Sequence, residues 1–290
     1  MDHQLIAQLE QAYFKGEYSR VIYRCDQLLN EATTSAAMRP HLLYWKGMAR
    51  QATGPAWHGQ AMSCLKEALA LARRDRSLKA RTIVSLGKLY ALVGDCPPFD
   101  KLMEEFTHLS ADNHPTVMRW GAFVWFNYGC TLDNAFRYGE AVPAFSRAAQ
   151  LAEQYNQPRV QGLSYHNLSG VHLCLGNLAE ASAAMTRAEA LLTDDDWKHK
   201  QLSRRAEYYL AAGQLVEAQQ LITEALLHPH IDDMTRADVY YTWARTLLGL
   251  NRPQEAAEKA LRALDFAMKD VHFPLIHKAN RFLQQLGATL

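Results

Sequence analysis

The stretch WFNYGCTLDNAFRYGEAVPAFSRA, residues 125–148, decides the fold of this chain. Apolar residues recur three and four positions apart on both sides of an interruption near Phe136, which indicates two amphipathic helices joined by a short turn. The stretch YHNLSGVHLCLGNLAEASAAMTRA, residues 165–188, shows the same spacings. A helical hairpin that recurs at a fixed period predicts an all-α solenoid, in which each hairpin packs only on its neighbours.

Weaker copies of the same hairpin fill the rest of the chain. Their turn positions are 37 to 42 residues apart: Gly16, Gly54, Gly94, Phe136, Gly176, Gly213 and Asn251. This phasing predicts seven repeats, at residues 2–38, 40–76, 78–112, 115–156, 158–193, 197–229 and 232–270. The apolar stripe of residues 271–290, which begins with Pro274 in its first turn, predicts a capping helix, since a solenoid needs a polar outer end.

The order of an aromatic residue, a Leu-Gly pair, a tyrosine and then Ala, Phe and Ala resembles the tetratricopeptide repeat (TPR) over essentially the whole chain. The resemblance implies a right-handed α-solenoid of about seven hairpins. Its copies exceed the usual length of about 34 residues. In this respect they are similar to the sensor domains of bacterial peptide-binding regulators of the Rap and PlcR kind and of MalT-type regulators. Long repeats also occur in kinesin light chain, so length alone does not choose among these proteins.

Composition limits the kinds of partner. The chain has 31 basic and 30 acidic residues, which leaves no net field for nucleic acid or for an anionic membrane. The N-terminal residues lack the features of a signal peptide, and the longest uncharged run is too polar to span a membrane. The five cysteines include no CxxC pair, which favours reduced thiols. We therefore expect a cytoplasmic protein.

Sequence motifs for catalysis or metal binding are missing. The chain contains no GxGxxG, Walker, HExxH or GxSxG motif, and this predicts a protein that is not an enzyme. His228 and His230 with Asp232 and Asp233 resemble a metal-ligand set, but a solvated linker is the expected reading. The run Asp194–Asp196 is expected at the entry of a helix. We predict no metal and no cofactor.

The resemblance implies that the first helix of each hairpin lines a concave groove. On these helices the groove positions are those opposite the residues that pack between helices. The predicted groove residues are Tyr44, Arg81, Lys88, Phe123, Phe126, Asn127, Cys130, His166, Asn167, Lys200, Arg204, Tyr241 and Arg245.

This predicted surface has a mixed chemistry. Asn127 and Asn167 suit an extended peptide, because an amide both donates to and accepts from backbone groups. Aromatic rings would take apolar side chains, and the flanking cations would hold a carboxylate. The alternative is that both asparagines satisfy neighbouring helix backbones and that the cations are solvated. Trp45, Trp120 and Trp125 are expected in the core or between repeats.

The sequence therefore predicts a non-catalytic scaffold that binds a peptide or protein segment in its groove. One form of this function is a bacterial regulatory protein that senses a signalling peptide and has no DNA-binding domain of its own. The alternative is a generic assembly adaptor or chaperone-like TPR protein. Nucleic acid is not expected as a partner, because the groove residues do not repeat as a base-reading code. The C-terminal helix is a candidate interface for a homodimer.

Overall fold

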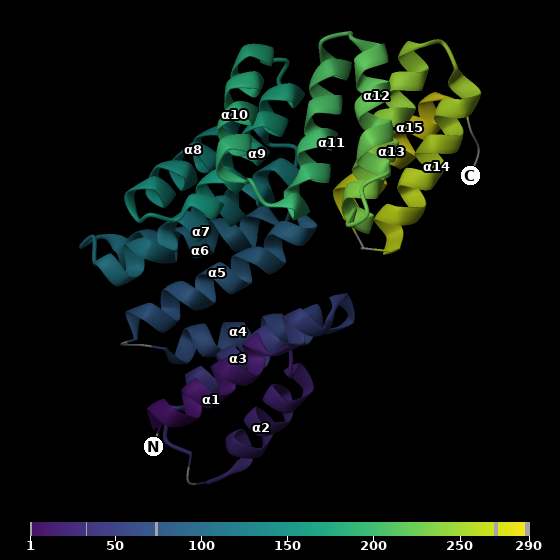
Figure 1. Cartoon of the computed structure of the whole chain (residues 1–290). Helices are drawn as coiled ribbons and strands as arrows, with labels where there is room; N and C mark the ends of the chain where they lie inside the picture. The colour runs from purple at the N-terminus through teal and green to yellow at the C-terminus, as the bar shows by residue number, and fades with distance from the viewer. Residues whose placement is uncertain (1, 33, 73–74, 270–271, 288–290) are drawn as a thin grey trace. The chain divides into compact units, whose positions relative to one another are not determined.

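The computed structural model describes residues 2–32, 34–72, 75–269 and 272–287, without the side chains of residues 2 and 3. In these residues the chain forms α-helices and one short 3-10 helix, and no β-strand (Figure 1). This confirms the predicted all-α helical-repeat solenoid fold. The chain divides into two compact units: unit 1 comprises residues 1–90 and 97–124, and unit 2 comprises residues 91–96 and 125–290.

The helices follow one another along the chain as hairpins. Unit 1 holds α1 (Asp2–Phe14), α2 (Tyr18–Asn30), α3 (Arg39–Thr53), η1 (Pro55–Trp57), α4 (His58–Leu71), most of α5 (Arg76–Val93), most of α6 (Cys96–Ser110) and the first half of α7 (Pro115–Asn134). Unit 2 holds the end of α7, α8 (Tyr138–Gln154), α9 (Pro158–Cys174), α10 (Leu178–Leu191), α11 (Asp195–Ala211), α12 (Leu215–Leu226), α13 (Asp233–Gly249), α14 (Pro253–Lys269) and α15 (Phe273–Gln285).

All seven turn positions singled out in the sequence adopt a positive φ. Phe136 and Asn251 both have a φ of 61°, and the five glycines range from 65° to 139°. At five of these turns the next residue donates its N–H to the carbonyl five positions earlier, for example Arg137 to Leu132 at 2.8 Å. This is the Schellman ending of a helix, which needs a left-handed residue after the last turn. Five of the seven hairpin turns therefore share one backbone geometry.

Small residues let the two helices of a hairpin approach closely. A Cβ atom built on Gly129 of α7 would lie 2.7 Å from the ring of Phe145 in α8. Gly47 faces Leu65 and Gly87 faces Phe99 in the same way. The second helices contribute fully buried alanines, of which Ala141 is one. The large side chain on one helix thus fills the space that the glycine on the other leaves.

Two helix starts depart from the usual placement of proline and of capping residues. Pro143 lies in the second turn of α8, which begins at Tyr138, although the missing N–H of a proline costs least in the first turn. Asp194 was expected to cap α11 and makes no side-chain cap bond, although Asp195 and Asp196 do lie in the first turn, where they favour the helix dipole. The side chain of Asp232 caps α13 instead, because it accepts from the Thr235 N–H.

The predicted repeat bounds stay a prediction, because helix ends alone do not fix where one repeat passes into the next. Parts of these repeats and of the predicted capping segment, at residues 33, 73–74, 270–271 and 288–290, lie outside the described residues. None of the described helices is long and apolar enough for a membrane span.

The last helix, α15, packs on α13 and α14 (Figure 1). It also reaches Phe136 in the α7–α8 turn. Its buried stripe includes Leu275, Ala279 and Leu283. On another side, the imidazole of His277 lies 5.9 Å from the ring of Phe136, and the Lys278 Nζ lies 5.6 Å from that ring. The final helix of unit 2 therefore contacts the turn of its first hairpin.

Candidate functional site

The first helices of the hairpins in unit 2, together with α15, bring ionisable and amide side chains to one surface. We call it the first-helix face, and its residues are Cys130, Asp133, Asn167, Cys174, Arg204, Glu207, Asp238, Tyr241 and Lys278. These residues come from α7, α9, α11, α13 and α15. Charges on one helix act on those of the others: Asp133 of α7 feels Lys278, Arg204 and Glu207. The face is open to solvent in part, since the Glu207 side chain is 23% exposed.

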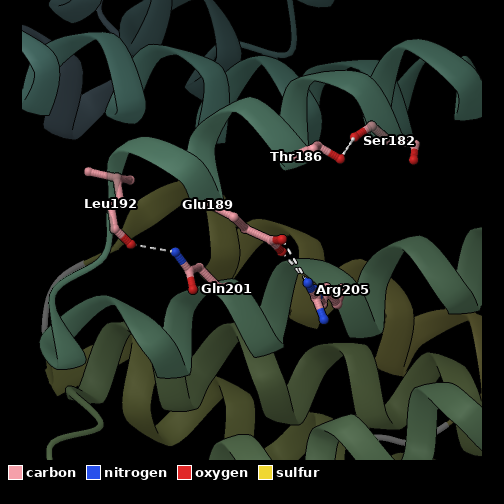
Figure 2. A network of polar contacts seen from close by, with 6 residues as sticks. All are labelled: Ser182, Thr186, Glu189, Leu192, Gln201 and Arg205. Atoms are coloured by element: carbon pink, nitrogen blue, oxygen red, sulfur yellow. Dashed lines mark hydrogen bonds and ion pairs between the residues drawn. The ribbon is translucent and has the colours of Figure 1, made fainter.

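Contacts between α10 and α11 fix the position of α11 (Figure 2). The Arg205 guanidinium makes two hydrogen bonds to the Glu189 carboxylate, at 2.6 and 2.7 Å, and the Gln201 Nε2 donates to the Leu192 carbonyl at 2.7 Å. In Figure 2 the Thr186 hydroxyl also donates to the Ser182 carbonyl within α10. Two parallel hydrogen bonds between a guanidinium and a carboxylate fix the relative orientation of the two groups. Arg205 thus anchors the helix that carries Arg204.

Arg204 lies against α9 and is neutralised on its own helix. Its guanidinium lies directly against Gly170, so a Cβ at this position would require the Arg204 side chain to shift. It also donates to the Glu207 carboxylate one turn further along α11. Because this positive charge already has a carboxylate partner, it is a weak candidate for holding a carboxylate of a ligand.

Two asparagines were predicted on this surface, and the structure places them differently. Asn127 is buried, at 9% exposure. Asn167 is half-buried, and its amide nitrogen donates to the Cys130 Sγ at 3.4 Å. Burial, with the charge of Asp133, raises the pKa of the Cys130 thiol, so the thiol stays neutral. Of the two amides, Asn167 is the one that a ligand can reach.

Asp133 and Asp238 of the first-helix face hold their protons unusually tightly. Burial raises the pKa of Asp133, against the opposing effect of Lys278. Burial, assisted by the negative charge of Glu207, raises the pKa of Asp238 to about 7. Desolvation disfavours the ionised carboxylate, and a nearby carboxylate adds to that cost. At neutral pH, Asp238 is therefore only partly ionised.

The other predicted residues of unit 2 surround this face. Lys200 forms an ion pair with Asp232 at 2.9 Å and lies 4.9 Å from the Trp197 ring. His166 meets Trp197 edge-on, and burial, with the nearby cations, lowers its pKa well below the usual value. Exposed Arg245 lies over Tyr241 at 6.0 Å. Phe126 packs against the core that includes Phe145, 5.9 Å away.

Four predicted groove residues belong to unit 1: Tyr44, Arg81, Lys88 and Phe123. Two of them, Tyr44 and Phe123, lie near Arg81, the second by way of Trp120. The Arg81 side chain makes the central contacts of this group. Its guanidinium lies 4.9 Å from the ring of Tyr44, which is buried, and 6.0 Å from Trp120. Phe123 is 5.7 Å from the same Trp120 ring. Lys88 is exposed on α5 and does not join them. Without a ligand, the role of these residues stays a prediction.

A histidine cluster lies where α11 meets the α12–α13 linker. The rings of His199 and His228 are 5.2 Å apart, and the His199 Nε2 lies 3.6 Å from an Asp232 oxygen. His199 of α11 thus adds a third imidazole to those of His228 and His230 in the linker. Even so, no group of three ligand side chains in the described part of the chain has the arrangement that a metal ion needs.

Sequence reasoning missed three members of the first-helix face: Asp133, Cys174 and Lys278. Asp133 follows Cys130 by three positions, so the helical period carried the signal that places both on one face. Lys278 gave no such signal, because it joins the face only when α15 returns to the α7–α8 turn.

Comparison with known proteins rests on structure alone. No protein-family model matches the sequence, and no curated protein does so either. A tetratricopeptide repeat protein from Parabacteroides merdae ATCC 43184 superposes with a TM-score of 0.65 at 15% identity, covering 96% of this chain and 98% of that one. The fold is that of a tetratricopeptide-repeat protein. BtubC (BKLC) from P. vanneervenii has the same kind of similarity, with a TM-score of 0.53 at 18% identity over 75% of this chain and 89% of its own.

At these identities the tetratricopeptide-repeat likeness concerns the fold, and function depends on the side chains that the fold presents. In unit 2 the side chains of the first-helix face include the accessible amide of Asn167 and the aromatic ring of Tyr241. They also include more acidic than basic groups. Such groups bind and orient a ligand by hydrogen bonds and charge.

Proposed function

We propose that this protein binds an extended segment of a peptide or partner protein on the first-helix face of unit 2, without a catalytic step. Asn167 is the observation that carries the proposal. Its nitrogen makes the long bond to the Cys130 Sγ, and its oxygen accepts no hydrogen bond from the described residues. A side-chain amide with free capacity to donate and accept matches the N–H and C=O groups of an extended backbone.

Other features of the same face support this proposal. Tyr241 and Arg245 lie beside one another at its α13 edge, where an aromatic ring and a cation suit side chains of a bound segment. Helical-repeat folds present extended surfaces of this kind to their partners. A regulatory sensor of a short peptide and an assembly adaptor both work through such binding, and the identity of the bound segment separates them.

The test is a selection of random dodecapeptides, displayed with free N-termini, on the full chain. We expect a convergent family of sequences. We also expect Asn167→Ala to weaken binding of a selected peptide about tenfold, the cost of one or two hydrogen bonds. Asn177→Ala, the same change on the exposed α9–α10 turn, is the matched control and should bind normally. Melting temperatures should match for all three proteins. A selection without convergence, or full binding by Asn167→Ala, would contradict the proposal.

A further inference from the structure

Two carboxyl groups on the first-helix face have no cationic partner of their own. Among the described residues, neither Asp133 of α7 nor Asp238 of α13 forms an ion pair, although Lys278 and Arg204 lie near enough to act on both carboxyl groups. The neighbouring cations are already engaged: Arg204 pairs with Glu207, and Lys200 pairs with Asp232. A half-buried carboxylate without a partner is costly, which marks both positions for explanation.

The charges that face Asp238 do not balance. They are Glu207 and Arg204 of α11, Asp232 of the α12–α13 linker and Lys278 of α15. After the Arg204–Glu207 and Lys200–Asp232 pairs are set aside, Lys278 alone faces both Asp133 and Asp238. Its Nζ lies over the Phe136 ring at 5.6 Å. When both carboxyl groups are ionised, one negative charge is therefore in excess on this face.

Aromatic side chains lie near Asp133 and contact one another. Tyr138, at the start of α8, interacts with Asp133 and with Tyr241 of α13. Tyr241 in turn meets Phe282 edge-on at 5.9 Å. Aromatic faces pack well against the methylene stem of a long basic side chain and attract a cation. The surroundings thus combine more carboxyl groups than cations with aromatic rings against which a basic side chain packs.

From this arrangement we infer that the segment bound on the first-helix face carries a primary ammonium or guanidinium group, which lies between Asp133 and Asp238. The inference rests on the proposed function and names the chemistry of its ligand. It also replaces the expectation that basic side chains of this surface hold a carboxylate, because Arg204 and Lys200 have carboxylate partners within the protein. The group can be a lysine or arginine side chain, or the α-amine of a peptide.

Binding of a cation would make the Asp238 carboxyl group release its proton, because a positive charge favours the ionised carboxylate. Because burial holds the Asp238 pKa at about 7, the carboxyl group is partly protonated before binding. A cation stabilises the ionised form, so affinity for a lysine or arginine side chain should rise about tenfold between about pH 6 and pH 8. An α-amine begins to lose its own proton near about pH 8, so the rise should be smaller for a peptide held by its N-terminus. An anionic group would favour the protonated form and reverse the trend.

The dodecapeptide selection tests the inference when it is run on the native chain and on the Asp133→Asn, Asp238→Asn double variant. For the native chain we expect a lysine or arginine at a fixed position, or loss of binding when the peptide N-terminus is acetylated. The first result identifies a side chain as the source of the cation, and the second identifies the α-amine. For the double variant we expect that preference to disappear. Asp265→Asn, the same change on exposed Asp265 of α14, should retain it.

Synthetic peptides then measure the effect. Replacing the selected lysine by norleucine, or acetylating the selected α-amine, should weaken binding at least about tenfold, and the affinity of the parent peptide should rise with pH. Convergent peptides without a basic group, and indifferent to acetylation, would overturn the inference and leave the proposed function standing. A selection with no convergence would overturn both. Equal circular dichroism of the variants and the native chain ensures that lost binding does not reflect unfolding.

Discussion

The ring of Phe136 in the α7–α8 turn lies 5.9 Å from the imidazole of His277 in α15. This contact joins the first hairpin of unit 2 to its last helix. It also depends on an unusual backbone, because Phe136 has a φ of 61°, a conformation that a bulky side chain rarely adopts. The same residue thus ends a helix as glycine would and supplies a ring that glycine lacks.

Substitutions at Phe136 separate these two roles. Phe136→Ala should destabilise unit 2 because it removes the ring and keeps the strained φ. Phe136→Gly removes the ring and relieves the strain, so it should be more stable than Phe136→Ala by about 1 kcal/mol. Urea unfolding of both variants measures this difference. An alanine variant as stable as the glycine variant would mean that the turn has relaxed out of the left-handed conformation.

Two glycines of one hairpin should respond oppositely to alanine. A Cβ at Gly129 would lie 2.7 Å from the Phe145 ring, so we expect Gly129→Ala to lower the free energy of unfolding by about 1–3 kcal/mol. A Cβ at Gly139 in α8 meets nothing within 4 Å, and Gly139→Ala should raise stability by roughly 0.5 kcal/mol through helix propensity. Thermal unfolding of both variants checks the pair. Equal effects would show that the hairpin helices are not in close contact at Gly129.

Asp238 should lower stability at alkaline pH. Its pKa is about 7 in the folded chain, raised by burial and then by Glu207, against an ordinary value of 3.8. An acid whose folded pKa is raised favours folding when protonated, and this contribution is lost as pH rises through about 7. Asp238→Asn should therefore stabilise the protein at about pH 8, by something on the order of 2 kcal/mol, and much less at about pH 5.

The measurement is urea unfolding at both pH values, with Asp265→Asn as the matched surface control. A gain of the same size at both pH values would show that Asp238 is not protonated in the folded chain. The binding test can be combined with this measurement. If the Asp238→Asn change raises the free energy of unfolding and weakens peptide binding, Asp238 lowers stability and serves recognition.

His199 should make the junction of α11 with the α12–α13 linker sensitive to acid. Its side chain is 3% exposed, and neither ring nitrogen makes a hydrogen bond within the described residues. Burial lowers its pKa, with Lys200 and His228 acting in the same direction and Asp232 opposing them. The unfolded chain therefore binds the proton more readily. Stability should be constant above about pH 7 and fall below about pH 6.5, by up to about 1.4 kcal/mol per pH unit.

His199→Gln removes this titration. Between about pH 7.5 and pH 5.5 we expect the native chain to lose about 1 kcal/mol more stability than the variant. The variant should still lose some, because burial also lowers the pKa of His166 and His272. Parallel unfolding curves for the two proteins across this range would count against protonation of His199.

Much of the local structure could be predicted because it repeats. The phasing of the hairpins located the seven turns within hairpins, including the one at Phe136, where no glycine gives the signal. The helical period also placed Asn167, Arg204 and Tyr241 on one set of helices. These features depend on residues three to five positions apart, which the sequence shows directly.

The helical period could not predict which charged side chains of the candidate site pair with one another. The partners of Lys200 and Lys278 lie on other elements, at Asp232 and at the α7–α8 turn, so their distances depend on how successive hairpins stack. Small errors in helical phase also matter: Asn127 was expected to be reachable and is buried. The grouping into two compact units has no marker in the sequence either.

The contact between α15 and the α7–α8 turn changes how unit 2 should fold. A linear array of repeats behaves as a chain of nearest-neighbour interactions, in which a terminal repeat can fray without consequence for distant ones. Here the final helix also holds the turn of the first hairpin, so fraying of α15 releases Phe136 as well. Unit 2 should therefore unfold with greater cooperativity than an open array, and during synthesis its first turn lacks this partner until the last helix has been made.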